Sequence, residues 1–237
     1  MKKYNRTKVY KQKRQPKYMF KWIANIIRSR NKNPQSLLDI GAASGDFLDY
    51  ASSCFVDCKL IGVEYDKTLV ETGREAQGLS YNLQHGDAEN LNFCDDMFDV
   101  VVMTGTHSIF DDFQLCFNEA LRVTKEDGLI LITGIFNDHP VDAQIYWKYP
   151  NQNSKDWNRG YNYWSKDTIS GFLIASSFQN SHEFIKFELP FDLDKNDDDP
   201  IRSWTEYSES GKKILVNGIM PLNFQCLVIK KKIWDIN

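Results

Sequence analysis

With 237 residues the chain fits one α/β domain with insertions, and its 29 basic and 32 acidic residues nearly balance, so nucleic acid or an acidic membrane is not indicated as a partner. The N-terminus lacks the apolar core of a signal peptide, no run is apolar enough to cross a bilayer, and the five cysteines form no repeated Cys-x-x-Cys pairs. We therefore expect a cytoplasmic protein with reduced cysteines, no metal site and no membrane contact.

The first 35 residues combine a basic arm with a helix. Nearly every charge between Lys2 and Lys21 is positive, and apolar residues recur at helical spacing over residues 18–30. The helix is expected to cover the sheet or a ligand site. For the arm we favour a solvated tail that orders over a substrate, and an RNA-binding arm is the alternative.

A glycine-bearing turn follows the first predicted strand. Residues 36–47 read Ser-Leu-Leu-Asp-Ile-Gly-Ala-Ala-Ser-Gly-Asp-Phe, an apolar strand that breaks at Gly41 and opens a helix after Gly45. Glycines allow the backbone to bend sharply or to approach a bound molecule closely, and the amides of the first helical turn point at that molecule. The spacing departs from the three-glycine dinucleotide pattern, so the turn predicts a ligand site without identifying the ligand.

Further strands alternate with helices up to residue 135. The apolar run at 60–63 ends in Glu64, about 20 residues beyond the turn, where nucleotide-binding α/β units place an acid on the ribose hydroxyls. The His-Gly-Asp-Ala-Glu sequence at 85–89 closes a third strand, and a fourth and a fifth are expected at 97–104 and 129–133. This alternation predicts a parallel sheet.

The motifs keep a fixed order. Leu-Asp-Ile-Gly-x-x-x-Gly is followed by Gly-Val-Glu, Gly-Asp-Ala, Phe-Asp-Val-Val and, after a helix, Leu-Arg-Val-Thr-Lys-Glu-Asp-Gly-Leu-Ile-Leu-Ile. Over residues 36–135 this order resembles the class I S-adenosylmethionine-dependent methyltransferases. The resemblance implies an α/β fold with a Rossmann-like, seven-stranded, mostly parallel sheet of strand order 3-2-1-4-5-7-6, helices on both faces, and S-adenosylmethionine as the cofactor. Residues 1–237 would form a single domain, with an arm and helix at 1–35 and a cofactor-binding core at 36–135.

The resemblance also implies roles for individual positions. Asp39 would lie near the methionine amino group of the cofactor, since a buried carboxylate needs such a partner or donors from the turn. Glu64 would bind the ribose and Tyr65 would lie against the adenine, while Asp87 and the Ala88 amide would contact the adenine edge. The alternatives are that Asp39 only ties down the turn and that Asp87 only caps the next one. The expected cofactor-binding set is Asp39, Gly41, Ala42, Gly45, Glu64, Tyr65, Asp87, Ala88 and Thr104.

Two segments, 136–164 and 191–221, lie outside the minimal core. Final strands are expected at 182–189 and 223–231. If the first of them runs parallel to the other strands, both segments leave from the carboxyl edge, where open parallel sheets bind ligands. We therefore predict that they form a substrate lid. Both are rich in aromatic residues, which we attribute mostly to packing, with a cage for an amine or methylammonium as the alternative.

Two histidines are the candidate catalytic residues. His107 lies just past the fourth strand, where methyl donor and acceptor meet in the family, and His139 lies in the first insertion; imidazole can accept a proton near neutral pH. Thr-Gly-Thr-His at 104–107 departs from the Asn or Asp, Pro-Pro and aromatic pattern of DNA amino-methyltransferases, which argues against methylation of a base's exocyclic amine. Substrate-binding roles are expected for Tyr18, Arg159, Tyr161, Tyr163 and Arg202.

The expected reaction is methyl transfer to an amine or hydroxyl of a small polar acceptor. The sequence Trp-Asn-Arg-Gly-Tyr-Asn-Tyr-Trp-Ser at 157–165 resembles that of bacterial methyltransferases associated with surface-polysaccharide biosynthesis, which implies a sugar precursor or a phosphorylated amino alcohol as the acceptor. An RNA methyltransferase that uses the basic arm and a non-catalytic methyltransferase-like partner subunit are the alternatives. The oligomeric state is not predicted.

Overall fold

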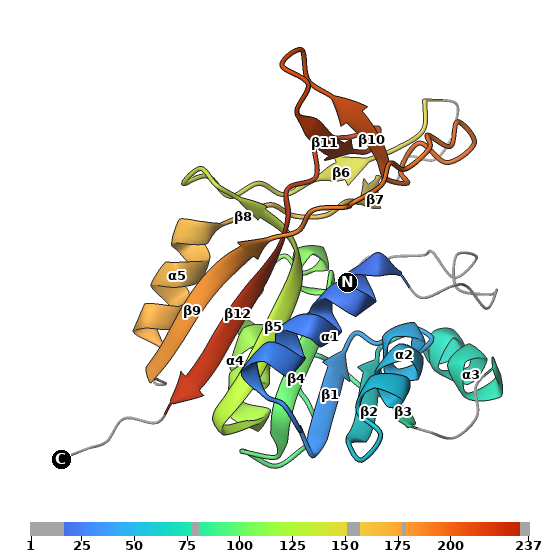
Figure 1. Ribbon diagram of the computed structural model, residues 1–237. Helices are drawn as coiled ribbons and strands as arrows, with labels where there is room; N and C mark the ends of the chain where they lie inside the picture. The colour runs from blue at the N-terminus through green and yellow to red at the C-terminus, as the bar shows by residue number, and fades with distance from the viewer. Residues whose placement is uncertain (1–16, 77–80, 151–156, 177–178, 233–237) are drawn as a thin grey trace.

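The computed structural model describes residues 17–76, 81–150, 157–176 and 179–232 (Figure 1). The expected basic arm up to residue 16 and the 151–156 part of the first insertion lie outside the described residues. The described part of the chain forms one large sheet with helices on both faces and two small ribbons above its upper edge in Figure 1.

Helices and strands alternate along the chain. In order they are α1 (Tyr18–Arg30), β1 (Ser36–Ile40), α2 (Asp46–Cys54), β2 (Lys59–Glu64), α3 (Lys67–Ala76), β3 (Asn82–His85), β4 (Phe98–Thr104), the 3-10 turn η2 (His107–Ile109), α4 (Gln114–Val123), β5 (Thr124–Asn137), β6 (Tyr146–Trp147), β7 (Asn158–Arg159), β8 (Trp164–Ser165), α5 (Lys166–Ala175), β9 (Gln179–Lys186), β10 (Trp204–Tyr207), β11 (Lys213–Val216) and β12 (Phe224–Lys232).

The large sheet has the strand order β3-β2-β1-β4-β5-β12-β9. Strands β1 to β5 pair in parallel, and β12 is antiparallel to both β5 and β9. The predicted fold class is therefore confirmed, including the single antiparallel strand. The sheet differs from the prediction in one detail, because the short strand β8 pairs in parallel with the end of β5 through Phe136 and Trp164.

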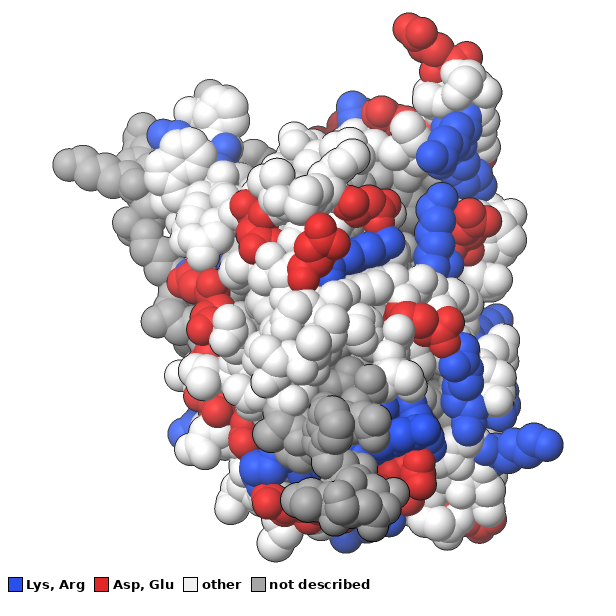
Figure 2. Space-filling model, turned by 90° about the vertical axis from the view of Figure 1, so that its left-hand side faces the viewer, with Lys and Arg blue, Asp and Glu red and all other residues white. Residues whose placement is uncertain are grey.

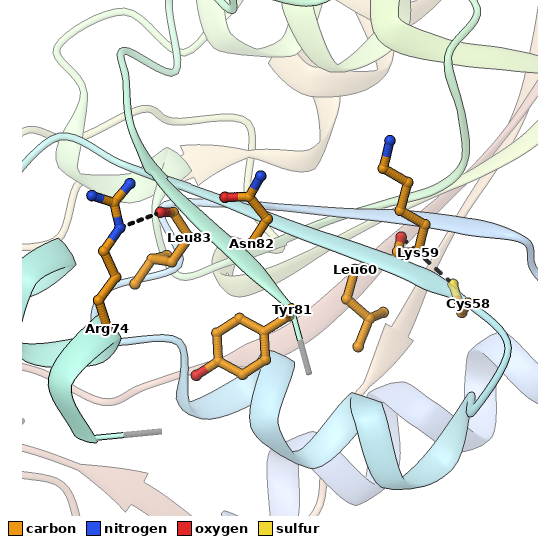
Figure 3. Close-up of a pocket in the computed structure, with 7 residues that line it drawn as sticks. All are labelled: Cys58, Lys59, Leu60, Arg74, Tyr81, Asn82 and Leu83. Atoms are coloured by element: carbon orange, nitrogen blue, oxygen red, sulfur yellow. Dashed lines mark hydrogen bonds between the residues drawn. The ribbon is translucent and has the colours of Figure 1, made fainter. Parts of the chain in front are cut away.

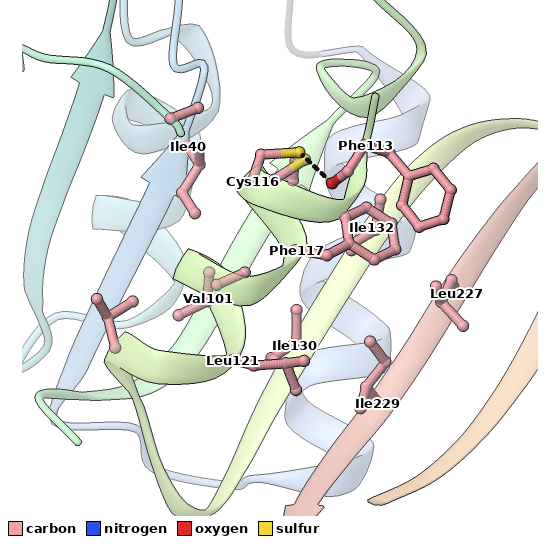
Figure 4. Packing of buried hydrophobic residues seen from close by; sticks show 14 of the residues in the cluster. Ile40, Val101, Phe113, Cys116, Phe117, Leu121, Ile130, Ile132, Leu227 and Ile229 are labelled. Atoms are coloured by element: carbon pink, nitrogen blue, oxygen red, sulfur yellow. Dashed lines mark hydrogen bonds between the residues drawn. The ribbon is translucent and has the colours of Figure 1, made fainter. Parts of the chain in front are cut away.

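Two apolar layers hold the helices to the sheet. On one face α4 and α5 cover the strands, and Phe117 and Leu121 of α4 lie over Ile130 and Ile132 of β5 (Figure 4). On the other face α1, α2 and α3 form a second layer, in which Ile27 of α1 is fully buried. The apolar stripe that predicted α1 from sequence is the stripe that faces this layer.

β5 is longer than the sequence predicts. It was expected at 129–133, where the apolar run ends, but it spans Thr124–Asn137. Thr124 already pairs with Phe98, and the register shifts before Val100, a feature that an apolar pattern does not encode. At the other end, antiparallel pairing with β12 continues to Ile135, so tertiary pairing extends the strand past the polar Thr133.

The two insertions form the small ribbons. The first carries β6 and β7 and the second carries β10 and β11, and both pairs are antiparallel. Both insertions begin at the carboxyl edge of the sheet, and the second also meets α1. The Phe191 ring lies 5.8 Å from the Tyr18 ring, and the Phe187 ring lies 5.0 Å from Trp22. The N-terminal helix and the second insertion therefore converge at this edge.

Candidate functional site

The glycine turn between β1 and α2 is shaped for close approach. Gly41 has φ +75°, and a Cβ there would lie 2.1 Å from Thr106 Oγ1. Gly45 has φ +83°, and a Cβ there would lie 2.7 Å from the Tyr81 hydroxyl. Only glycine fits both the left-handed conformation and the missing space. The amides of Gly41 and Ala42 both donate to Val63 O, at 2.8 and 3.0 Å, which fixes the turn against β2.

Glu64, at the end of β2, ties the glycine turn to the next loop. Its half-buried carboxylate accepts from Ala43 N at 2.9 Å through Oε2 and from Asp66 N at 2.8 Å through Oε1. Each carboxylate oxygen has more than one acceptor site, so these bonds leave Glu64 able to accept from hydroxyls as well. The expected ribose ligand thus stands beside the turn in a fixed orientation.

Asp39 is the most unusual acid of the site. Its side chain is 2% exposed, and Oδ1 has no hydrogen-bond partner among the described residues. Burial, and secondarily the charge of Glu64, raise the pKa of Asp39 to about 8. A buried carboxylate without a partner is costly, and a nearby cation relieves that cost. The position therefore suits a ligand that brings an ammonium group to the glycine turn.

The expected adenine end lies at the carboxyl ends of β2 and β3. Tyr65 is 54% exposed, with its ring 6.2 Å from that of His85. Asp87 accepts from Glu89 N at 2.9 Å, so the turn-capping role that competed with adenine recognition is present. The Ala88 side chain is buried in the core, which holds its backbone in place. These residues surround an open aromatic face.

The two candidate histidines have opposite environments. His139 is exposed, whereas His107 is fully buried and stacks on Phe136 with 4.7 Å between ring centroids. Neither ring nitrogen of His107 has a hydrogen-bond partner among the described residues. Burial lowers the pKa of His107 to about 4. The His107 ring is therefore neutral at physiological pH and packed away from solvent.

Arg159 fastens the first insertion to the loop after β4. Its guanidinium donates to Ile109 O at 2.8 Å and pairs with Asp111, and it lies 5.8 Å from the Tyr146 ring centroid. The Arg159 side chain is 8% exposed. The guanidinium thus has partners within the protein, and its predicted substrate-binding role stays a prediction.

Asn162 is the second residue that holds the first insertion to the loop after β4. Its backbone amide donates to Ser108 O and its Nδ2 donates to Phe110 O, both at 2.6 Å. Its Oδ1 accepts from Ile145 N at 3.3 Å, and the residue is 1% exposed. The loop after β4 therefore takes its shape from contacts with the first insertion.

The remaining predicted substrate residues are dispersed. Tyr18 packs on the second insertion, Tyr161 is half-buried in the first, and Arg202 is exposed in the second. The Tyr163 hydroxyl donates to Pro221 O at 2.6 Å and accepts from Asn223 N, which joins the two insertions. None of these contacts tests the predicted roles.

Several aromatic rings in the insertions already make cation–π contacts with lysine or arginine side chains of the protein. Lys148 Nζ lies 5.0 Å from the Trp157 ring centroid, and Lys195 Nζ lies 5.6 Å from that of Trp204. With the guanidinium over Tyr146, three of the rings considered for a cation cage have an internal partner. This favours packing over the cage.

Three residues at or near the carboxyl edge of the sheet were not predicted from the sequence: Thr106, Thr133 and Asn162. Thr106 donates to Ile40 O at 3.2 Å and fills the space beside Gly41. Thr133 has a buried hydroxyl without a partner among the described residues. A single polar residue after an apolar run forms no pattern that would predict its role. The one signal was Gly41, because a glycine in a turn indicates that another group packs closely against it.

A surface pocket lies at the opposite edge, near the amino ends of β2 and β3. Figure 3 shows Arg74 donating to Leu83 O at 2.9 Å within it. Its lining residues are Cys58, Lys59, Leu60, Arg74, Tyr81, Asn82 and Leu83. We assign it no role in the site, because ligands of open parallel sheets bind at the carboxyl edge.

Comparison with known proteins shows similarity to methyltransferases over strands β1 to β5. Residues 38–132 match the family of methyltransferase domains. The chain is 34% identical over 104 residues to an uncharacterized methyltransferase, YcgJ, of Bacillus subtilis. The aligned residues make up 40% of this chain and 39% of that protein. It is 29% identical over 104 residues to the demethylmenaquinone methyltransferase of Bacteroides fragilis, covering 42% of each. The matches thus span about two-fifths of the length of these relatives.

The fold agrees with these matches. The crystal structure of the YcgJ protein superimposes with a TM-score of 0.58 at 18% identity, covering 89% of this chain and 98% of that one. The fold and the glycine turn are those of a nucleotide-binding α/β domain with an acid at each of two strand ends. Over residues 38–132 the chain is similar to the class I S-adenosylmethionine-dependent methyltransferases, and S-adenosylmethionine is the cofactor of that family.

The described residues fit this cofactor. Glu64 has acceptor sites left for ribose hydroxyls, and an ammonium group would pair with the buried Asp39 Oδ1, which has no partner among the described residues. No cluster of three metal-binding side chains occurs in the described part of the chain. None of the helices within that part is long and apolar enough to span a membrane.

Proposed function

We propose that the chain transfers a methyl group from S-adenosylmethionine to an amine or hydroxyl of a small polar acceptor in the cytoplasm. The observation that carries the proposal is the unpartnered Asp39 carboxyl beside the fixed Glu64 at the glycine turn. The sulfonium of the cofactor makes its methyl group reactive, so the protein's task is to align the acceptor and keep its lone pair free.

For the acceptor we propose a phosphorylated amino alcohol or a sugar precursor of surface polysaccharide. The sequence of residues 157–165 supports this class. A quinone-type acceptor is a second candidate, because one relative is a demethylmenaquinone methyltransferase and because aromatic rings gather where α1 meets the second insertion. A flat acceptor would stack on rings such as Tyr18 and Trp22.

The histidines have separate proposed roles. Burial penalises a positively charged His107, so we propose that it positions the loop after β4 and the acceptor while it stays neutral. His139 is exposed, which suits proton removal if the insertion brings it to the acceptor. We propose a hydroxyl or an uncharged amine as the accepting group in either case.

The alternatives make different demands on the surface. RNA binding needs a continuous basic surface. Over α5 and β9, Lys and Arg side chains alternate with Asp and Glu side chains, as Figure 2 shows, so this face is of mixed charge. A non-catalytic subunit does not need the acids of the cofactor site, and Asp39 and Glu64 are both present at it.

The test combines calorimetry with a methyl-transfer assay. S-adenosylmethionine should bind the full chain, and Glu64→Ala should weaken binding without loss of the fold. Transfer should occur to a member of a panel of amino-alcohol phosphates, nucleotide sugars and soluble quinols. If S-adenosylmethionine binds, no panel member is methylated and tRNA protects the chain from proteolysis at low salt, the RNA alternative is favoured. If S-adenosylmethionine binds but neither methyl transfer nor this protection is seen, the partner-subunit alternative is favoured.

A further inference from the structure

Among the buried oxygens that have no hydrogen-bond partner among the described residues, three lie at the carboxyl ends of the adjacent strands β1, β4 and β5: Asp39 Oδ1, Thr104 Oγ1 and Thr133 Oγ1. Buried polar groups in folded proteins nearly always pair, and the exceptions call for a reason. The carboxyl of Asp39 is accounted for by the ammonium group of the proposed cofactor. The two hydroxyls are left without a role.

The two hydroxyls face the same side of the sheet. Thr104 and Thr133 are direct partners in the parallel pairing of β4 and β5, whose backbones lie about 4.8 Å apart. Side chains alternate along a strand, and Val102 and Leu131, two residues earlier, belong to the apolar layer under α1 and α2. Thr104 and Thr133 therefore point into that same layer, side by side.

Asp39 points into the layer as well. Leu37, two residues before it on β1, is part of that layer, and β1 is the other neighbour of β4. Three adjacent strands thus place unpaired oxygens on one face. The chain next to this group borders open space, because a Cβ at Gly105 would meet no atom within 4 Å. The end of β4, next to the unpaired Thr104, therefore has room for a ligand.

The chemistry of the two threonines selects the ligand. Each hydroxyl donates one hydrogen bond and accepts others, so a pair of them suits a neutral group that does both. The neighbouring carboxyls of Asp39 and Glu64 disfavour an anion on this face. A neutral hydroxyl or an uncharged amine meets both conditions.

We propose that Thr104 and Thr133 hold the methyl-accepting atom of the substrate, which binds as an uncharged hydroxyl or amine. This rests on the proposed function, and it moves Thr104 from the cofactor to the acceptor. In the transfer, the acceptor lone pair forms the bond to the methyl carbon while the carbon–sulfur bond breaks toward sulfur, and the acceptor proton passes to the base proposed above, His139. The two hydroxyls orient that lone pair.

Thr104→Val and Thr133→Val test the assignment, because valine keeps the branched shape and removes only the hydroxyl. Each variant should lower kcat/KM for the acceptor about tenfold, the effect of one lost hydrogen bond, with an unchanged Kd for S-adenosylmethionine. Without ligands each should melt at the same temperature as the wild type or about 2–4 °C higher, since an unpaired buried hydroxyl stabilises nothing.

Thr124→Val is the matched control. Thr124 is also buried in β5, but its Oγ1 donates to Ala120 O at 2.6 Å. This variant should lower Tm and leave kcat/KM unchanged, the reverse of the other two. The contrast separates an acceptor-binding hydroxyl from a structural one.

The outcomes separate this inference from the proposed function. If the wild type transfers methyl groups and both threonine variants keep its kcat/KM, the inference is wrong and the function stands. If the wild type transfers to no acceptor in the panel, the proposed function fails, and the melting temperatures still decide whether the hydroxyls are unpaired. A lower Tm for Thr133→Val, like that of Thr124→Val, would overturn the assignment.

Discussion

Replacing Asn162 by alanine should loosen the loop that follows β4. The wild-type side chain donates to Phe110 O at 2.6 Å and accepts from Ile145 N at 3.3 Å, at a site that is 1% exposed. Alanine leaves a carbonyl and an amide without these partners. A buried polar group that loses its partner costs about 1–3 kcal/mol, so we expect a loss of about 2–4 kcal/mol in the free energy of unfolding, the longer bond contributing less.

Urea unfolding followed by circular dichroism measures this loss. Asn158→Ala is the matched control, because Asn158 is an exposed asparagine of β7 in the same insertion and should change stability by less than about 0.5 kcal/mol. Asn162→Asp retains the acceptor for Ile145 N and loses the donor to Phe110 O, and it should also destabilise the chain. Equal midpoints for Asn162→Ala and the wild type would refute the reasoning.

The same variant should affect turnover more than cofactor binding. The loop holds Thr106 beside Gly41 at one end and is fastened by Asn162 at the other. Loosening it should lower kcat, with little change in the Kd for S-adenosylmethionine, because Glu64 and Asp39 stand on other strands. A parallel fall in cofactor affinity would show that the loop belongs to the cofactor site instead.

Three further predictions concern the cofactor side. Glu64→Ala should weaken S-adenosylmethionine about 10- to 150-fold by calorimetry, because charge-assisted hydrogen bonds are worth about 1.5–3 kcal/mol. Gly41→Ala should abolish detectable binding, since its Cβ would lie 2.1 Å from Thr106 Oγ1 at φ +75°. Because the pKa of Asp39 is raised from 3.8 to about 8, the folded chain holds a proton that the unfolded chain releases in this window, so stability should fall as pH rises from about 4 to 8. Asp39→Asn should flatten that slope in Tm measured against pH.

The sequence predicts what depends on local pattern. The apolar stripe of α1, the glycine turn and the alternation of strands with helices are each encoded within a few residues. The strand order followed from the family resemblance, and the sheet has that order. The boundaries of β5 were missed, because pairing with Phe98 at one end and with β12 at the other is a long-range property.

The predicted site divides in the same way. Asp39 and Glu64 could be chosen because strand ends and spacing mark them. The buried state of His107 could not be foreseen, since it depends on Phe136, which lies 29 positions further along the chain. Arg159 carries the charge of a substrate ligand, but whether its guanidinium faces a substrate or Asp111 is decided only when the insertion packs on the loop.

The loop after β4 joins the cofactor side to the insertion side. Thr106 donates to Ile40 O at 3.2 Å and occupies the space beside Gly41, while the Ser108 and Phe110 carbonyls are held by Asn162. If acceptor binding shifts the first insertion, the shift would reach the glycine turn through the five residues 106–110 of this loop. Such a coupling is reciprocal, so a cofactor that orders the turn favours acceptor binding by the same factor that the acceptor favours the cofactor. Under this coupling the insertion should influence cofactor affinity only while an acceptor is bound, so the Kd for S-adenosylmethionine alone should stay little changed in Asn162→Ala.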